Sequence, residues 1–191
     1  MPSSPLVLVT GPTRSGKSEW AESLAMTSQR TVTYVATAQR NPADPDWEAR
    51  IERHKQRRPE AWRVWECSGC LTPILRDAQV TDCLLIDSLG TWLVNYLESP
   101  ADAWSATSVN LLTHLETTAA QVILVTEETG WGIVPAYPSG RLFRDRLGTL
   151  TRQVAALCSQ FYLVVGGYAV DLKQVGTLVP PMPWQANLTP Q

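Results

Sequence analysis

The sequence predicts an α/β fold in which a mostly parallel sheet is flanked by helices. Short runs rich in Val, Ile and Leu alternate along the chain with longer segments of helical periodicity, as in a parallel sheet with helical connections. Apolar residues make up 44% of the 191 residues and charged residues 18%, which suits a packed core and excludes disorder over most of the chain. We expect residues 1–175 to form one domain and residues 176–191 to form a proline-rich tail.

Six segments are predicted strands because they are short and rich in β-branched residues. They are Leu6 to Thr10, Val32 to Thr37, Arg63 to Glu66 (the weakest), Cys83 to Asp87, Gln121 to Thr126 and Phe161 to Gly166. Helices are predicted from Lys17 to about Ser28, from Asp46 to Arg58 before Pro59, and around Trp104 to Leu115. A further helix carries Phe143, Leu147, Leu150, Val154 and Leu157, whose spacing places all five on one face.

The charge balance restricts the possible partners. Sixteen Lys and Arg against eighteen Asp and Glu leave a net charge of −2, so there is no overall positive field to hold nucleic acid or an anionic membrane. The apolar runs are far shorter than the roughly 18 residues that cross a bilayer, and the first residues do not resemble a signal peptide. We therefore expect a cytoplasmic protein without membrane insertion and without a nucleic-acid partner.

The four cysteines are expected to be free thiols, as is usual in a reducing cytosol. Cys67 and Cys70 have C-x-x-C spacing, but a zinc site needs a second pair of ligands, and the two histidines stand alone in the sequence. A packing role for these thiols is favoured over a metal-binding or redox role.

A segment that matches G-x-x-x-x-G-K-[ST] lies between the first predicted strand and the helix that follows it. Its residues are Gly11, Pro12, Thr13, Arg14, Ser15, Gly16, Lys17 and Ser18. The glycines let backbone N–H groups surround phosphate oxygens at the positive end of the helix. Lys17 can then reach the β and γ phosphates, and the Ser18 hydroxyl is placed to hold Mg²⁺. This predicts a P-loop nucleotide-binding catalytic domain, and a plain glycine turn is the weaker alternative.

Carboxylates follow two further strands at the edge where open α/β sheets bind ligands. Asp87 ends a buried strand and is the candidate partner of Ser18 for Mg²⁺; the alternative is that it caps the helix starting at Ser88. Glu127 and Glu128 end the next strand, and one of them could act on a substrate hydroxyl or on water. Simple solvation in a loop is an equally good interpretation of Glu127.

The predicted helix before Pro59 places His54 on one stripe with Trp47 and Ile51. A lone histidine in this setting is more often structural than catalytic. A neutral imidazole is nevertheless suited to attack phosphorus, because Arg50 and Arg58 could stabilise the phosphate charge. The residues alone leave these two interpretations open.

Six blocks in order carry a resemblance that covers about residues 6 to 173. They are LVTGPTRSGKS with Glu22, YVATAQ (34–39), ARIERHKQRRP (49–59) followed by Trp62 and Arg63, LLIDSLGTWLVN (84–95), VTEETGWGIVP (125–135) and LFRD (142–145). Together they resemble the bifunctional adenosylcobinamide kinase and adenosylcobinamide-phosphate guanylyltransferase family of cobalamin assembly. Six ordered blocks are far more specific than the phosphate loop alone.

The resemblance implies two reactions, with GTP and ATP as co-substrates and Mg²⁺ as the metal. A nucleoside triphosphate phosphorylates the aminopropanol hydroxyl of adenosylcobinamide, and GTP then donates GMP to adenosylcobinamide phosphate, giving adenosylcobinamide-GDP. It also implies that His54 carries the GMP covalently, that the fold is RecA-like and that the protein is a homotrimer. Glu128 is assigned as a helper in the kinase step. A monofunctional small-molecule kinase and a nucleotide-dependent regulatory ATPase are the alternative functions.

This chain departs from the family pattern at three places. Pro12 stands where glycine is common and cannot donate a backbone N–H to phosphate, which could shift nucleotide affinity. Ser88 replaces a usual Cys, and Thr151-Arg152 replaces an Asn-Gln pair. A kinase transfers the γ phosphate whereas guanylylation attacks the α phosphate, so the helix over residues 46–58 is expected to be mobile.

Overall fold

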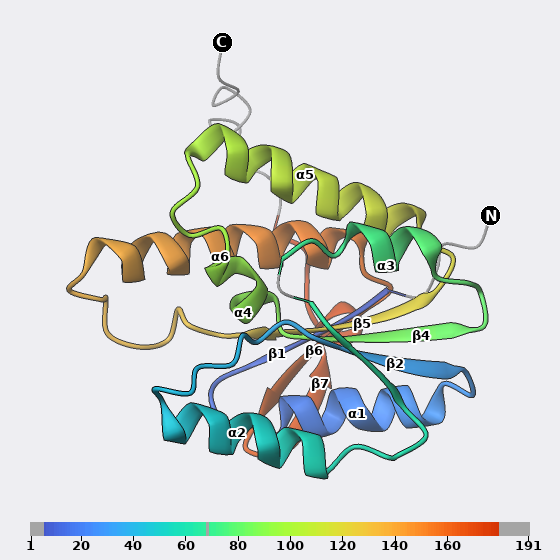
Figure 1. Ribbon diagram of the computed structural model, residues 1–191. Helices are drawn as coiled ribbons and strands as arrows, with labels where there is room; N and C mark the ends of the chain where they lie inside the picture. Colours follow the sequence, from blue (N-terminus) through green and yellow to red (C-terminus); the bar gives the residue numbers. More distant parts are fainter. Residues whose placement is uncertain (1–5, 68, 180–191) are drawn as a thin grey trace.

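The computed structural model describes residues 6–67 and 69–179, which form a seven-stranded sheet between two layers of helices (Figure 1). The strands are β1 (Leu6–Gly11), β2 (Thr31–Ala36), β3 (Arg63–Glu66), β4 (Asp82–Asp87), β5 (Gln121–Glu127), β6 (Gln160–Val165) and β7 (Tyr168–Asp171). Their order is β3-β2-β4-β5-β1-β6-β7, and every neighbouring pair is parallel except β6 and β7. The predicted fold class is confirmed.

Helices cover both faces of the sheet. They are α1 (Lys17–Thr27), α2 (Pro45–Gln56), α3 (Thr72–Asp77), α4 (Leu89–Val94), α5 (Ala101–Thr117), α6 (Pro138–Leu157) and α7 (Leu172–Val175). Figure 1 shows α1 and α2 on one face and α3, α4, α5 and α6 on the other. No helix among the described residues combines the length and apolar character needed to cross a membrane.

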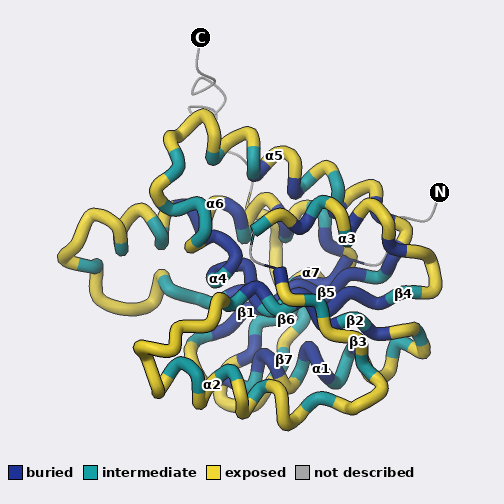
Figure 2. The backbone as a smooth tube through the Cα atoms, viewed as in Figure 1, coloured by how far each residue is buried: buried dark blue, intermediate teal, exposed yellow. Residues whose placement is uncertain are grey.

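The central strands are buried on both faces, which is why they appear in the sequence as continuous apolar runs. In β1, Leu6 and Leu8 face the core under α4, α5 and α6, whereas Val7 and Val9 face the core under α1. All six residues of β1 are buried, and Figure 2 shows the same for most of β4 and β5. This packing holds the carboxyl ends of β1, β4 and β5 side by side.

Sequence periodicity located six strands, α1 and α2 within one or two residues, whereas α5 and α6 begin three and five residues before the starts predicted for them. The helix expected over 46–58 begins at Pro45, capped by Asp44, and ends at Gln56, so Arg58 lies beyond its end. The prediction missed β7, α3 and α7, which have four to six residues each. Residues 176–179 have no helix or strand, and the rest of the predicted tail lies outside the described residues.

Candidate active site

The phosphate loop connects the end of β1 to the start of α1, as its motif predicts. Gly16 precedes the helix with φ +96°, a left-handed conformation that favours glycine, and Arg14 has φ +59°. Gly11 is required for a different reason, because a Cβ there would lie 2.3 Å from the carbonyl oxygen of Val164 on β6. The sequence therefore places glycine where the turn needs it and where a neighbouring backbone comes close.

Hydrogen bonds to neighbouring segments hold the loop on both sides. The backbone N–H of Glu128 donates to the Gly11 carbonyl (3.0 Å), and that of Gly167, in the turn between β6 and β7, donates to the Ser15 carbonyl (3.2 Å). Buried Lys17 points back into the loop, where its Nζ donates to the Pro12 carbonyl at 3.3 Å. These contacts fix the loop from both sides and keep its lysine inside.

The carboxylate of Asp87 lies at the end of β4, level with Ala36 on β2 and Val125 on β5. Tyr34 Oη donates to Asp87 Oδ2 at 2.9 Å, and His54 Nδ1 lies 3.7 Å from the same oxygen. The capping alternative for Asp87 is wrong, because Ser88 caps α4 and accepts a hydrogen bond from the Thr91 N–H. The Asp87 carboxylate is therefore not used as a helix cap, and it remains a candidate metal ligand at the carboxyl edge of the sheet.

Glu127 is enclosed by the start of α4, so the interpretation as a solvated loop residue is wrong. Its Oε1 accepts a hydrogen bond from Ser88 Oγ, and its Oε2 accepts one from the Gly90 N–H at 3.1 Å. Burial raises the pKa of this carboxyl, because the charged form loses solvation; the Ser88 hydrogen bond lowers it and the Asp87 charge raises it. Glu127 thus ties β5 to the turn that follows Asp87.

Glu128, the other carboxylate of this pair, is half-buried at the end of β5. Its Oε1 accepts a hydrogen bond from the Gly130 N–H at 2.7 Å. Its backbone N–H donates to the Gly11 carbonyl of the phosphate loop, so Glu128 is attached directly beside the candidate nucleotide site.

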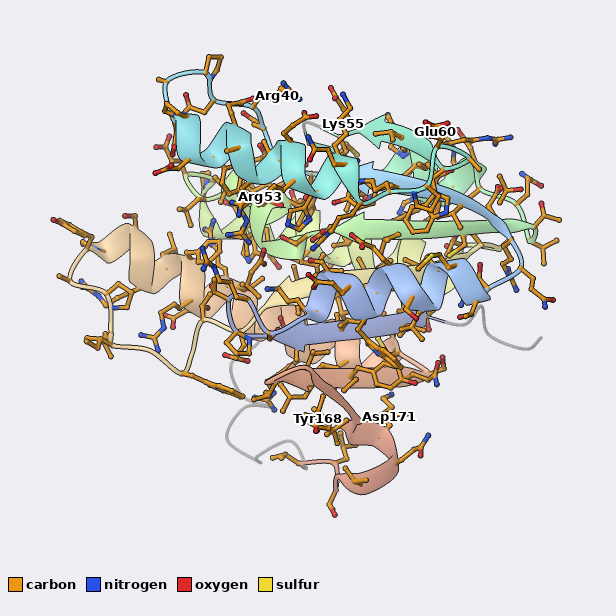
Figure 3. All side chains as sticks on the ribbon, turned by 90° about the horizontal axis from the view of Figure 1, so that it is seen from below. Arg40, Arg53, Lys55, Glu60, Tyr168 and Asp171 are labelled. Atoms are coloured by element: carbon orange, nitrogen blue, oxygen red, sulfur yellow. The ribbon has the colours of Figure 1, made fainter. Side chains whose placement is uncertain are left out.

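His54 belongs to α2, a helix with no buried residue, which lies at one end of the molecule (Figure 2). Figure 3 shows Arg40, Lys55 and Glu60 at this end, and Tyr168 and Asp171 of β7 at the opposite end. The inner side of α2 nevertheless brings His54 to Asp87 of β4. Residues that are far apart in the sequence, 46–58 and 84–88, therefore meet at the carboxyl edge of the sheet.

The electrostatic surroundings favour the neutral form of His54. Desolvation lowers its pKa below the ordinary value, and the charges of Arg57, Arg50 and Arg58 lower it further; the charge of Asp87 raises it. Neutral imidazole has the lone pair that a nucleophile needs. The arrangement suits attack on an electrophilic phosphorus at neutral pH.

The arginines around His54 have separate contacts. Arg57 pairs with Glu19 (2.5 Å) and Glu22 (3.2 Å) of α1, and its Nη2 lies 3.3 Å from His54 Nδ1. Arg58 stacks its guanidinium 3.6 Å above the Tyr34 ring, while Arg50 is exposed beside Trp47.

Sequence reasoning identified Arg50 and Arg58 and named Glu127 with two open interpretations, but it missed Arg57 and Tyr34. Tyr34 and Arg57 lie inside the family-like blocks, which is the one indication that could have found them.

Two candidate metal ligands supply hard oxygen donors. Ser18 lies in the first turn of α1 and Asp87 at the end of β4, and Mg²⁺ prefers such hydroxyl and carboxylate oxygens together with phosphate oxygens. Among residues 6–67 and 69–179, no three His, Cys, Asp or Glu side chains gather as a metal-binding group. Buried Cys67 donates to the carbonyl of Cys70 at 3.4 Å.

Comparisons with known proteins agree with the blocks and with the fold. The family model described as cobinamide kinase / cobinamide phosphate guanyltransferase matches residues 7–172. The bifunctional adenosylcobalamin biosynthesis protein CobU of Escherichia coli K12 is 36% identical over 183 residues, covering 88% of this chain and 99% of that protein. The corresponding CobP of Pseudomonas aeruginosa is 38% identical over 169 residues, covering 87% and 96%.

Solved structures with little sequence similarity share the fold. PH0250 of Pyrococcus horikoshii OT3 superposes with a TM-score of 0.53 at 6% identity, over 88% of this chain and 85% of that one. An ATPase of a bacterial type III secretion system superposes with a TM-score of 0.50 at 9% identity, over 91% of this chain; the chain spans 59% of that ATPase. The fold is that of RecA-like P-loop NTPases.

Proposed function

Because the chain belongs to the cobinamide kinase / cobinamide phosphate guanyltransferase family, we propose that it catalyses both reactions of that name. It phosphorylates the aminopropanol hydroxyl of adenosylcobinamide from a nucleoside triphosphate, and it then transfers GMP from GTP to adenosylcobinamide phosphate. One observation carries the proposal of two activities: His54 Nδ1 lies 3.7 Å from Asp87 Oδ2 at the end of β4, at the same edge of the sheet where the phosphate loop follows β1.

The phosphate loop, residues 11–18, serves the triphosphate in both reactions. Lys17 leaves the Pro12 carbonyl and bonds the β and γ phosphates, which offer a charged acceptor in place of a neutral one. Ser18 and Asp87 hold Mg²⁺, which supplies positive charge against the phosphate oxygens when it is bound. Arg50 and Arg58, near His54, add positive charge at the α phosphate.

In guanylyl transfer His54 is the nucleophile. A P–N bond forms between its ring and the α phosphorus, the bond between the α phosphorus and the bridging oxygen breaks, and the electron pair leaves with pyrophosphate. A phosphate oxygen of adenosylcobinamide phosphate then attacks the same phosphorus and releases the histidine. The negative charge of Asp87, 3.7 Å from Nδ1, stabilises the positive charge that the ring gains as it bonds the phosphorus.

In the kinase step Glu128 accepts the proton of the aminopropanol hydroxyl as its oxygen attacks the γ phosphorus. Support comes from its place at the end of β5, where its backbone bonds Gly11 of the phosphate loop. The ADP or GDP formed is the leaving group.

The test is retention of label from GTP. Purified protein is incubated with Mg²⁺ and GTP labelled at the α or the γ phosphate, denatured and separated from free nucleotide. We expect α label to be retained through a bond that resists alkali and breaks in acid, and to be lost in His54→Ala. His114→Ala is the matched control, because His114 is the second of two histidines and lies on α5.

Three results would contradict this assignment in different ways. Retention of α label in His54→Ala would remove His54 from the reaction. Absence of label in wild type, with GTP bound, would favour the monofunctional kinase. Nucleotide hydrolysis that is indifferent to corrinoid, without transfer to it, would favour the regulatory ATPase.

We further propose that the enzyme is a cytoplasmic homotrimer, as the family resemblance implies. Support for an interface between copies comes from apolar side chains on the edge hairpin β6–β7, where Val165, Tyr168 and Val170 are exposed. Light scattering of the purified protein tests the trimer directly.

A further inference from the structure

The connection between β5 and α6 exposes an unusual amount of apolar surface. Trp131 is 60% exposed, Ile133 95%, Val134 65% and Tyr137 77%. Figures 1 and 2 show that this connection projects beyond the carboxyl edge of the sheet and is exposed along most of its length. Contiguous exposed apolar side chains in a soluble protein mark a binding surface.

The backbone of this connection is fixed although its side chains are exposed. Arg144 of α6 donates to the carbonyls of Gly130 (3.1 Å) and Ile133 (3.4 Å). Arg141 donates to the carbonyls of Pro135 (3.0 Å) and Ala136 (2.7 Å). Two arginines thus bond four backbone carbonyls of the segment from the protein side, and the apolar side chains are presented outward at little further entropic cost.

The segment begins at the site of phosphoryl transfer. Glu128 lies two residues before the segment; its backbone N–H donates to the Gly11 carbonyl of the phosphate loop, and its carboxylate accepts a hydrogen bond from the Gly130 N–H within the segment. A ligand that rests on residues 130–137 is therefore positioned to extend a side chain over the phosphate loop. A second copy of the chain has a separate apolar surface in the hairpin β6–β7, where Tyr168 is 79% exposed.

We propose that residues 130–137 form the platform that binds the corrinoid macrocycle of the acceptor. This inference rests on the proposed function and names the substrate-binding surface of that same site. The segment contains no Asp, Glu, Lys or Arg, which suits a large ring edged with methyl groups and neutral amides. The aromatic side chains of Trp131 and Tyr137 supply rigid contact area, and Ile133 and Val134 supply aliphatic area.

The platform accounts for a requirement of the chemistry. Both reactions use the same end of the acceptor, first as a hydroxyl and then as a phosphate. A macrocycle held at one place beside the phosphate loop keeps that end in reach for both steps. The nucleotide and His54 then change position between the steps, while the acceptor remains bound at the same place.

The test compares the double variant Ile133→Ser/Val134→Ser with the matched control Val80→Ser/Val109→Ser. Val80 (66% exposed) and Val109 (58% exposed) are similarly exposed valines outside the platform. Cobinamide binding is measured by ultrafiltration, using the absorbance of the corrinoid. We expect the Kd to rise at least tenfold in the platform variant and to stay unchanged in the control. Labelling of His54 by GTP needs no corrinoid and stays at the wild-type level in both.

Two results would overturn the platform. One is an unchanged cobinamide Kd in Ile133→Ser/Val134→Ser. The other is a change in oligomer mass of that variant by light scattering, which would assign the surface to a second copy of the chain. Ile133→Ser alone serves as a second variant, since a side chain exposed to 95% contributes little to folding. Cobinamide binding is measured without GTP. A failure of His54 labelling in wild type would therefore contradict the proposed function without affecting the test of the platform.

Discussion

Replacing Gly90 by Ala is expected to destabilise the protein through a single contact with Glu127. A Cβ on Gly90 would lie 2.1 Å from Glu127 Oε2. Carbon and oxygen atoms in ordinary contact are separated by more than about 3 Å, so the carboxylate has to move by roughly 1 Å. That movement breaks its hydrogen bonds to the Gly90 N–H and to Ser88 Oγ.

The magnitude follows from the two hydrogen bonds that are lost. Each is made to a buried carboxyl whose raised pKa favours the uncharged form, and such a bond contributes about 0.5–1.5 kcal/mol, so Gly90→Ala should cost about 1–3 kcal/mol in the free energy of unfolding. For a domain of this size each kcal/mol corresponds to about 2–4 °C, which gives a fall in Tm of roughly 2–12 °C. In a Glu127→Ala background the clash is absent, and Ala in the helix should be neutral or stabilising by up to about 1 kcal/mol.

Thermal and denaturant unfolding of the four proteins in this double-mutant cycle supply the assay. Gly148→Ala in α6 is the control, because a Cβ there meets no atom within 4 Å and the expected effect is a small stabilisation. Equal destabilisation by Gly90→Ala in both backgrounds would refute the reasoning. We also expect Gly90→Ala to weaken Mg²⁺-dependent nucleotide binding. The displaced Glu127 holds Ser88, and Ser88 directly follows the candidate metal ligand Asp87.

Three further outcomes follow from the site. Arg57→Met removes a charge that lowers the pKa of His54, so the acid limb of the pH profile for His54 labelling should move to higher pH; an unmoved limb would count against the electrostatic account. Burial raises the pKa of Glu127, so its stabilising contribution is full below pH 4.5 and is lost as the pH rises through the folded-state pKa; the Tm of Glu127→Gln relative to wild type should therefore increase between pH 4.5 and 8, and a constant difference would contradict this. Pro12→Gly supplies a backbone N–H in the phosphate loop and should lower the Kd for GTP by about tenfold, whereas an unchanged Kd in equilibrium titrations would show that this position makes no phosphate contact.

The sheet could be predicted from the sequence because its central strands are buried on both faces. Such strands consist of uninterrupted Val, Ile and Leu, and the phosphate loop between β1 and α1 fixes where the carboxyl edge lies. The edge strand β7 (Tyr168–Asp171) was not predicted, whereas the equally short β3 was the weakest of the predicted strands; elements of four largely exposed residues carry little apolar pattern.

The contacts around Asp87 could not be derived from periodicity, because they depend on the register of separate strands. Asp87 is level with Ala36 of β2, and this register places the Tyr34 hydroxyl 2.9 Å from its carboxylate. The same holds for Glu127: its sequence position suits solvent equally well, and its enclosure by the start of α4 depends on how β4 and β5 align. A carboxylate after a strand can bind metal, cap a helix or tie two segments together, and which of these it does is set by residues some 40 positions away.

We propose that the polar attachment of α2 allows one phosphate loop to serve two different phosphorus atoms. Its spacing of Trp47, Ile51 and His54 predicts an amphipathic helix, yet the helix has no buried residue and is held by polar contacts, chiefly from Arg57 to α1. Partly exposed ion pairs are worth about 0–1 kcal/mol each, so α2 can move without disturbing either core. On this proposal, phosphate replaces the carboxylates that Arg57 contacts, and nucleotide binding is thereby coupled to the position of His54. Hydrogen exchange over residues 46–58 should therefore change when GTP binds, and equally slow exchange with and without GTP would contradict this account.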